Sequence, residues 1–265
     1  MNAIEKYNLR ADAVRSLLCI GLDTDTTRIP ERFREAEFPQ FEFTRYVIEA
    51  TSDHAAAYKL NIAFYESTGD TGFRELKMSM DYLREKHPDI LTICDSKRGD
   101  VENTNEEYTK SLFDWFGFDA VTLHPYLGEK SLQPFLRRRE KGCIILCRTS
   151  NPGAPEIQDL KIDGKPLWLV VAEKVRDDWN GNKNCLLVVG GTYPDEMKTL
   201  RAEMGEMPFL VPGLGAQGGD LRAVLQGGLD LKKRGLILAA ARSIIFAEDP
   251  ELEAKKLKDE INIFR

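Results

Sequence analysis

The chain has 265 residues, 42% of them hydrophobic and 30% charged, which is the balance of an ordinary globular protein. Its formal net charge is −6, which argues against a general nucleic-acid-binding protein, because such proteins usually carry a basic surplus. The acidic balance does not exclude a small anionic ligand, since a few well-placed cations are enough to hold a phosphate.

The beginning of the chain bears on its location. Residues 1–15 are charged and lack the apolar core of a signal peptide. No segment approaches the ~18 consecutive apolar residues that a membrane span needs. We therefore expect a cytoplasmic protein that does not act in a membrane.

The sequence contains five cysteines, and their spacing favours buried, reduced thiols: Cys19, Cys94, Cys143, Cys147 and Cys185. Most of them fall inside apolar runs. Cys143 and Cys147 are four residues apart, but no His or Cys pair follows them at the spacing of zinc ligands. We expect no metal at these positions.

Short apolar runs recur along the chain, and each has the length of a strand. A nearly continuous apolar run is typical of a strand buried on both faces of a parallel sheet. The eight runs are residues 17–23, 56–64, 89–97, 119–125, 143–150, 185–192, 208–215 and 235–243. Amphipathic helical patterns separate them, among them residues 71–87, 101–117 and 167–180, and residues 251–264 follow the last run.

This repeated alternation of strand and helix predicts an α/β protein with parallel strands. Eight units in about 240 residues fit a single (β/α)8 TIM barrel. An open doubly wound sheet is the alternative, but no Gly-x-Gly-x-x-Gly follows the first run, which weakens the dinucleotide-binding form of that fold. No linker or low-complexity segment divides the chain, so we expect one domain over residues 1–265.

Polar side chains gather at the ends of these runs, where the active site of a barrel lies. Asp23 ends the first run, Lys59 and Asn61 lie in the second, and Asp95 and Lys97 end the third. The later runs end with His124, Ser150, Thr192, Gln217 and Arg242. Charged residues rarely occupy buried strands without partners, so this clustering predicts a functional site.

Asp95 and Lys97 are two residues apart, so on a regular strand they project from the same face. A structural ion pair is the alternative to a catalytic pair. Nearby carboxylates favour the ammonium form of a lysine, which suits a general acid and not a Schiff-base nucleophile. Asp100 precedes the predicted helix 101–117 and is interpreted as its N-cap, as a catalytic carboxylate, or as both.

A second cluster is the glycine-rich segment 211–220, which follows the seventh run. Glycines let backbone N–H groups approach an anion, and the segment leads into a helix N-terminus. Arg242, after the eighth run, adds a cation with forked donors. Because the loops after strands 7 and 8 are the usual phosphate site of this barrel, we predict a phosphate-bearing ligand.

A third cluster is residues 148–160, where Pro and Gly predict a loop. This loop is interpreted either as a plain surface turn or as a cover over a ligand that offers Ser150 as a polar contact.

Together these residues resemble the orotidine 5′-phosphate decarboxylase family. Asp95-Ser96-Lys97-Arg98-Gly99-Asp100-Val101 matches the family signature Asp-x-Lys-x-x-Asp followed by an aliphatic residue, and Thr104 stands where the family has a threonine. Further blocks follow in the family's order over nearly the whole chain: residues 19–23, 59–61, 149–153, 212–219 and 242–243. The length and the Ser-Asn-Pro-Gly block look like the longer bacterial branch.

The resemblance implies decarboxylation of orotidine 5′-phosphate to UMP, the last step of de novo pyrimidine synthesis, without metal or organic cofactor. It implies that Lys97 protonates C6 of the pyrimidine, while Asp95 lies by the departing carboxylate and holds Lys97. It also implies a homodimer with shared sites, in which Asp100 and Thr104 reach the ribose bound by the other subunit.

The same resemblance implies the remaining substrate contacts. Asp23 and Lys59 bind ribose hydroxyls, and Ser150 reads the pyrimidine edge. The phosphate contacts are Gln217 and Arg242, aided by backbone donors near Pro212 and Ala241.

Two positions depart from the family pattern. Leu60 stands where the longer branch usually has proline, and Ala241 where glycine often precedes the arginine. Neither change removes a charged group, and Ala241 keeps its N–H.

Two alternative functions remain open. The metal-dependent branch of the same superfamily acts on sugar phosphates such as 3-keto-gulonate 6-phosphate and carries acidic ligands before the shared signature. The second run here has Lys59 and Asn61 and no acidic residue among its inward-facing positions. A catalytically silent phosphate-binding barrel is the other alternative, but it would not need Lys97 between two aspartates.

Overall fold

The computed structural model describes residues 1–213 and 220–265. Eight of the described strands pair in parallel and close into a barrel, in the order β1-β10-β9-β8-β5-β4-β3-β2. They are β1 (Leu18–Gly21), β2 (Ala57–Asn61), β3 (Leu91–Arg98), β4 (Ala120–Leu123), β5 (Gly142–Arg148), β8 (Cys185–Val189), β9 (Phe209–Val211) and β10 (Leu236–Ala240). Each strand falls on one of the eight predicted runs, so the predicted barrel is confirmed.

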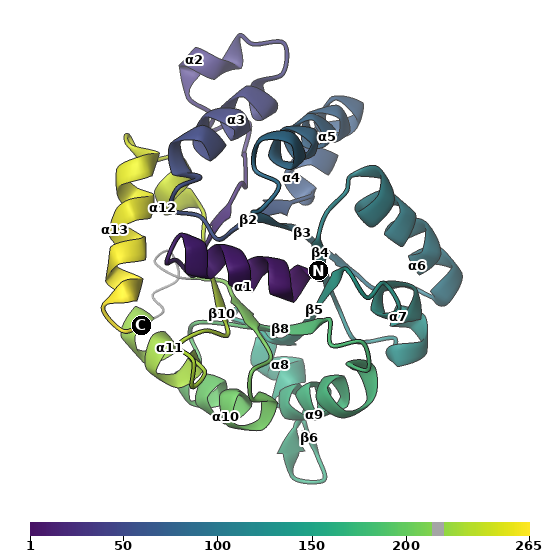
Figure 1. Ribbon diagram of the computed structural model, residues 1–265. Coiled ribbons are helices and arrows are strands. Elements are labelled where there is room, and N and C mark those ends of the chain that lie inside the picture. The colour runs from purple at the N-terminus through teal and green to yellow at the C-terminus, as the bar shows by residue number, and fades with distance from the viewer. Residues whose placement is uncertain (214–219) are drawn as a thin grey trace.

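Helices surround the barrel (Figure 1). They are α1 (Ala3–Ala13), α2 (Glu31–Arg34), α3 (Pro39–Thr51), α4 (Ala63–Glu66), α5 (Gly69–Lys86), α6 (Glu102–Thr109), α7 (Glu129–Leu136), α8 (Ala154–Gln158), α9 (Leu167–Lys174), α10 (Pro194–Met204), α11 (Leu221–Gly228), α12 (Arg242–Ile245) and α13 (Pro250–Asn262). Wider π-helical turns, η1 (Lys110–Trp115) and η2 (Val175–Trp179), continue α6 and α9. All four helical patterns that the sequence predicts are present. A small antiparallel hairpin, β6 (Lys161–Ile162) and β7 (Lys165–Pro166), lies outside the barrel.

Helix α1 was not predicted, and it covers the amino-terminal end of the barrel. Figure 1 shows it lying across the centre of the ring of strands. Its buried residues, Ala3, Tyr7 and Ala11, recur every four positions. The hydroxyl of Tyr7 donates to the carbonyl of Leu236 at 2.6 Å, which ties the helix to β10. The opposite, carboxyl end of the strands is therefore the end left for a ligand.

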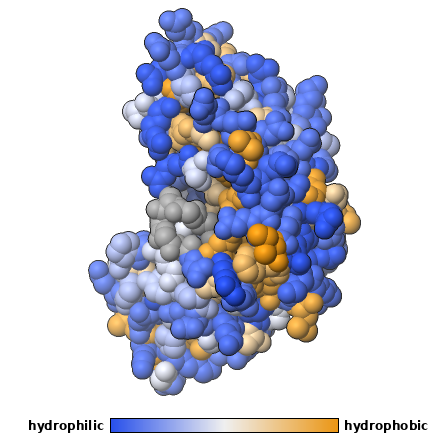
Figure 2. Space-filling view, turned by 90° about the vertical axis from the view of Figure 1, so that its left-hand side faces the viewer, coloured by the Kyte–Doolittle hydropathy of each residue, from blue (hydrophilic) through white to orange (hydrophobic). Residues whose placement is uncertain are grey.

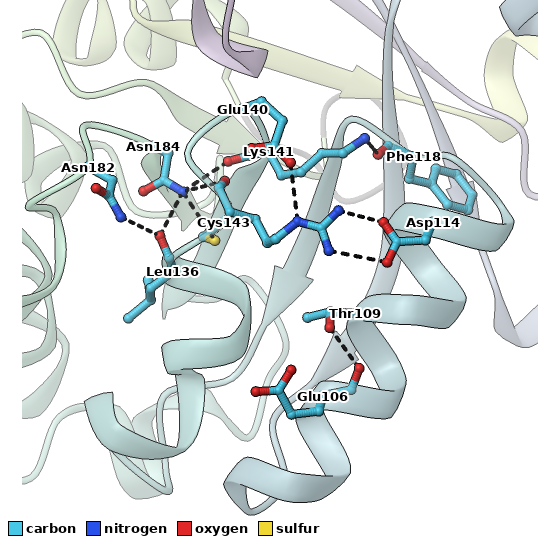
Figure 3. A network of polar contacts seen from close by, with 11 residues as sticks. Glu106, Thr109, Asp114, Phe118, Leu136, Glu140, Lys141, Cys143, Asn182 and Asn184 are labelled. Atoms are coloured by element: carbon cyan, nitrogen blue, oxygen red, sulfur yellow. Dashed lines mark hydrogen bonds and ion pairs between the residues drawn. The ribbon is translucent and has the colours of Figure 1, made fainter.

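A polar network holds α7 and η1 against the amino-terminal side of β5 and β8 (Figure 3). The amide of Asn184, which is buried, donates to the carbonyls of Leu136, Arg138 and Lys141. Arg138 in turn pairs with Asp114 of η1. Buried polar groups need such partners, so this network fixes the segment between α7 and β5.

The five cysteines are free and buried, as the sequence predicted. Burial raises the pKa of the Cys147 thiol to about 12, so this thiol stays protonated at neutral pH.

No helix within residues 1–213 and 220–265 is long and apolar enough to cross a membrane. On the side shown in Figure 2, hydrophilic residues cover most of the surface, and hydrophobic residues form small separate groups.

Candidate active site

Three charged residues, Asp23 just after β1, Lys59 in β2 and Asp95 in β3, meet inside the carboxyl end of the barrel. Lys59 of β2 lies between two carboxylates, with its Nζ 3.3 Å from Oδ1 of Asp23 and 3.2 Å from Oδ2 of Asp95. The strand register explains the meeting, because Lys59 pairs with Gly21 of β1 and with Ile93 of β3. The sequence predicted all three residues at this end of the barrel.

Lys59 is a buried cation, since only 8% of its side chain is exposed. Burial disfavours its charge, but Asp23 and Asp95 outweigh burial and raise the pKa of Lys59 above its ordinary value. Burial also opposes the charge of Asp95, yet Lys59 and Lys97 lower the pKa of this carboxyl to about 2. Lys59 and Asp95 are therefore both ionised at neutral pH.

Asp95 also holds Lys97. The Nζ of Lys97 lies 2.6 Å from Oδ1 of Asp95, and the same oxygen accepts a hydrogen bond from the hydroxyl of Thr122 at 2.9 Å. About half of the Lys97 side chain is exposed, at 52%, whereas the Asp95 side chain is 13% exposed. The mostly buried carboxylate of Asp95 thus holds the Lys97 ammonium in place, while the exposed part of the Lys97 side chain remains accessible to a ligand.

The backbone at Lys97 departs from a regular strand. Its φ is 45°, in the left-handed region that non-glycine residues rarely adopt. The pairing of β3 with β4 is irregular there, because Cys94 pairs with Val121 and Arg98 with Leu123. Asp95 and Lys97 do meet, but simple alternation along a strand is not the reason. Strain of this kind persists where the surroundings fix it, and it is often found at functional sites.

The structure corrects the interpretation of Asp100 as a helix N-cap. The helix begins at Glu102, and its N-cap is Val101, whose N–H donates to Oδ1 of Asp100. Asn105, which the sequence did not single out, instead holds this turn. Its side chain bonds both the N–H and the carbonyl of Asp100 and also reaches the carbonyl of Ser131.

Two adjoining pockets occupy the carboxyl end of the barrel, and they share Lys59, Asp95 and Pro212. The first is also lined by Asp23, Ala241 and Arg242, among other residues. The second is also lined by residues of the third, fourth and fifth strands and the segment after β5, including Lys97, Thr122, Ser150, Asn151 and Gln158. Asp95 thus stands at the boundary between a pocket lined by the cation Arg242 of α12 and a pocket lined by the cation Lys97 of β3.

Asp100 and Thr104 line neither of these pockets in the described part of the chain. Asp100 is exposed, and Thr104 is half-buried on α6. Gln217 falls within residues 214–219 and so lies outside the described residues.

Ser150 and Ala241 are placed by close contacts with glycine. A Cβ at Gly190 would lie 2.8 Å from the Cβ of Ser150, and a Cβ at Gly21 would lie 2.7 Å from the Cβ of Ala241. Both distances are shorter than side chains tolerate, so these glycines permit the packing at each pocket.

Residues 148–160 are not entirely a loop as predicted. Residues 154–158 form the short helix α8, in whose first turn Pro155 is tolerated, because a helix needs no N–H there. Thr149 and Gln158 bridge the segment through two hydrogen bonds of 2.9 and 2.8 Å. Ser150, Asn151 and Gln158 thereby face the second pocket together.

Three other residues that the sequence predicted for the site are not among the described residues that line the two pockets. Asn61 accepts from the N–H of Ala63 and shapes the turn before α4. His124 packs against Gly99, where a Cβ would lie 2.7 Å from the carbonyl of His124. Thr192 has a buried hydroxyl without a hydrogen-bond partner among the described residues. The strand-end position alone therefore over-predicted the site.

Comparison with known proteins identifies the family of this chain. A sequence model described as the orotidine 5′-phosphate decarboxylase / HUMPS family matches residues 16–257. The chain belongs to this family. It is 42% identical to the orotidine 5′-phosphate decarboxylase of Cellvibrio japonicus, with all of both chains covered. It is 45% identical to that of Herpetosiphon aurantiacus, over 92% of this chain and 89% of the relative.

Solved structures of family members share the fold. A Leishmania donovani OMP decarboxylase superposes with a TM-score of 0.88 at 36% identity, covering 100% of this chain and 98% of that one. The UMP synthase of the same organism gives a TM-score of 0.90 at 38% identity, covering 100% of this chain and 56% of that one.

Proposed function

We propose that this protein decarboxylates orotidine 5′-phosphate to UMP and carbon dioxide, the final step of de novo pyrimidine synthesis, without metal or organic cofactor. One observation carries the proposal: the ammonium of Lys97 is fixed 2.6 Å from Asp95 and faces an open pocket. Full-length relatives with the name of this enzyme support the choice of substrate.

Breaking the bond between C6 and the carboxylate leaves an electron pair on C6 that the pyrimidine ring delocalises poorly. The Lys97 ammonium beside C6 stabilises this charge and then transfers a proton from Nζ to C6. Asp95 keeps the ammonium in place and lies by the substrate carboxylate that departs. Repulsion between these two negative charges raises the free energy of the bound substrate. Lys59 offsets the charge of Asp95 from the opposite side.

The two pockets suit the two ends of a nucleotide. The phosphate lies in the first, held by Arg242 and by backbone donors near Pro212 and Ala241, with Gln217 as a further contact. The ribose hydroxyls bind Asp23 and Lys59 at the boundary. The base enters the second pocket, where Ser150 reads its edge.

The exposed position of Asp100 suits a contact in trans. We propose a homodimer in which Asp100 and Thr104 of one subunit complete the site of the other. We further propose that residues 1–265 act as one domain and that the protein is cytoplasmic.

The metal-dependent branch of the family is the less favoured alternative. Within the described residues, no group of three or more His, Cys, Asp or Glu side chains is arranged to hold a metal ion. Lys59 of β2 instead places a cation between Asp23 and Asp95.

The test is the absorbance change as orotidine 5′-phosphate becomes UMP, run beside an assay with 3-keto-gulonate 6-phosphate. We expect turnover of the nucleotide only. Turnover of the sugar phosphate alone would favour the metal-dependent branch. Absence of both activities in folded protein would favour a silent phosphate-binding barrel.

A further inference from the structure

Arg148, at the end of β5, is a buried arginine that lines neither pocket. Only 2% of its side chain is exposed. A guanidinium cannot lose its charge at physiological pH, so its burial requires charged or aromatic partners. Those partners come from two different segments of the chain.

The first partner is Asp159, which follows α8, with its Oδ1 3.0 Å from Nη1 of Arg148. The others belong to the segment after β8. Glu196 of α10 lies 3.7 Å from Nη2, and the Tyr193 ring centroid lies 3.7 Å from Cζ. Nη2 donates a hydrogen bond to Oδ2 of Asp159 at 3.4 Å, whereas Nε and Nη1 make none within the described residues. This one bond, charge pairing and the ring contact therefore hold the group.

These contacts fasten one segment, residues 149–159, at both ends. Arg148 immediately precedes the segment, and Asp159 is its last residue. The backbone of Arg148 is fixed as well, because its carbonyl accepts from the N–H of Gly190 at 2.7 Å. Ser150 rests on that same glycine. A shift of the Arg148 guanidinium would therefore displace Ser150, which lines the second pocket.

We propose that Arg148 is a positioning residue for recognition of the base: it sets the place of Ser150 by clamping residues 149–159 to the segment after β8. The inference rests on the proposed function, which places the base in the second pocket. Arginine suits this role because its forked, planar group reaches two carboxylates and stacks on a ring at once, which lysine cannot do.

The test compares two ligands by calorimetry, UMP and ribose 5-phosphate, which lacks the base. Arg148→Met should weaken UMP binding about tenfold, the worth of one well-placed hydrogen bond, while ribose 5-phosphate binding stays within about twofold. Arg148→Lys should be intermediate. Equal weakening of both ligands would indicate a general folding defect and would overturn the proposal.

A double-mutant cycle tests whether Arg148 acts through Ser150. In a Ser150→Ala background, Arg148→Met should cause no further loss of UMP affinity. Additive losses would overturn the proposal. If Arg148→Met does not fold, Asp159→Asn removes the more exposed partner and should show the same ligand preference in weaker form. Glu156→Gln, an exposed change on α8, is the matched control and should alter neither affinity.

The result also separates this inference from the proposed function. If wild-type protein binds UMP more tightly than ribose 5-phosphate and Arg148→Met leaves that preference unchanged, only the role of Arg148 fails. If wild-type protein shows no preference for UMP, both fail.

Discussion

The Nζ of Lys97 lies 2.6 Å from Oδ1 of Asp95, although the backbone of Lys97 is turned to a φ of 45°. The hydroxyl of Thr122 links the two residues, since it accepts from the N–H of Lys97 and donates to Asp95. Because both the side chain and the backbone of Lys97 are hydrogen-bonded, its ammonium is held in one place before substrate binds. Such preorganisation is what a developing negative charge requires.

Lys97→Ala should abolish most turnover, because it removes the proposed proton donor and the charge beside C6. We expect a loss of at least about 10²–10⁴-fold in kcat, with UMP affinity largely kept. Steady-state assays and calorimetry measure the two quantities. Lys174→Ala, an exposed lysine of α9, is the control. Near-normal turnover of Lys97→Ala would refute the assignment.

Asp95→Asn should destabilise the fold in a pH-dependent way. The pKa of Asp95 is about 2 in the folded protein and 3.8 ordinarily, so its ionisation stabilises the fold above pH 4. The contribution is roughly 2 kcal/mol and disappears as pH falls from about 4 to 2. Urea unfolding of both proteins from pH 6 downward measures it. If the difference in unfolding free energy between the two proteins does not shrink as the pH falls, the ionised pairing of Asp95 with Lys59 and Lys97 is contradicted.

Gly21→Ala should weaken phosphate binding, because the new Cβ would lie 2.7 Å from the Cβ of Ala241 in the first pocket. Overpacking of this kind costs about 1–3 kcal/mol. We expect a loss of UMP affinity of about tenfold or more, measured by calorimetry.

Adding Ala241→Gly should restore that affinity, since it removes the opposing methyl group. Gly181→Ala is the matched control, as nothing lies within 4 Å of its Cβ position. A failure of Ala241→Gly to rescue Gly21→Ala would show that the contact is not the cause.

Mixing inactive Lys97→Ala and Asp100→Ala proteins tests the proposed shared site. A mixed dimer contains one site with both residues intact, so complete subunit exchange should restore about a quarter of wild-type activity. Size-exclusion chromatography checks that both variants remain dimers. If exchange restores nothing, Asp100 does not act in trans.

The barrel was predictable from the sequence because each of its strands is a nearly continuous apolar run, as in residues 143–150. The Asp95 and Lys97 pair was predictable because both residues belong to one short segment. Helix α1 was missed, since its buried face consists only of Ala3, Tyr7 and Ala11 and two of these are small.

Other features depend on tertiary contacts that spacing does not reveal. Thr122 meets Asp95 through the pairing of β4 with β3, 27 positions away in sequence. The burial of Arg148 requires Glu196, which lies on α10. Asn61 and His124 end strands as predicted, but the chain turns there and directs them to local contacts. Position at a strand end therefore identifies a candidate site residue, but the conformation of the turn that follows determines whether its side chain lies in the site.

The proposed decarboxylation of orotidine 5′-phosphate needs no metal ion. The most direct measurement follows the absorbance change from orotidine 5′-phosphate to UMP with protein that has been treated with EDTA and then freed of chelator. A reaction that needs no metal ion should proceed at an unchanged rate. Complete loss of turnover that a divalent metal ion restores would contradict it.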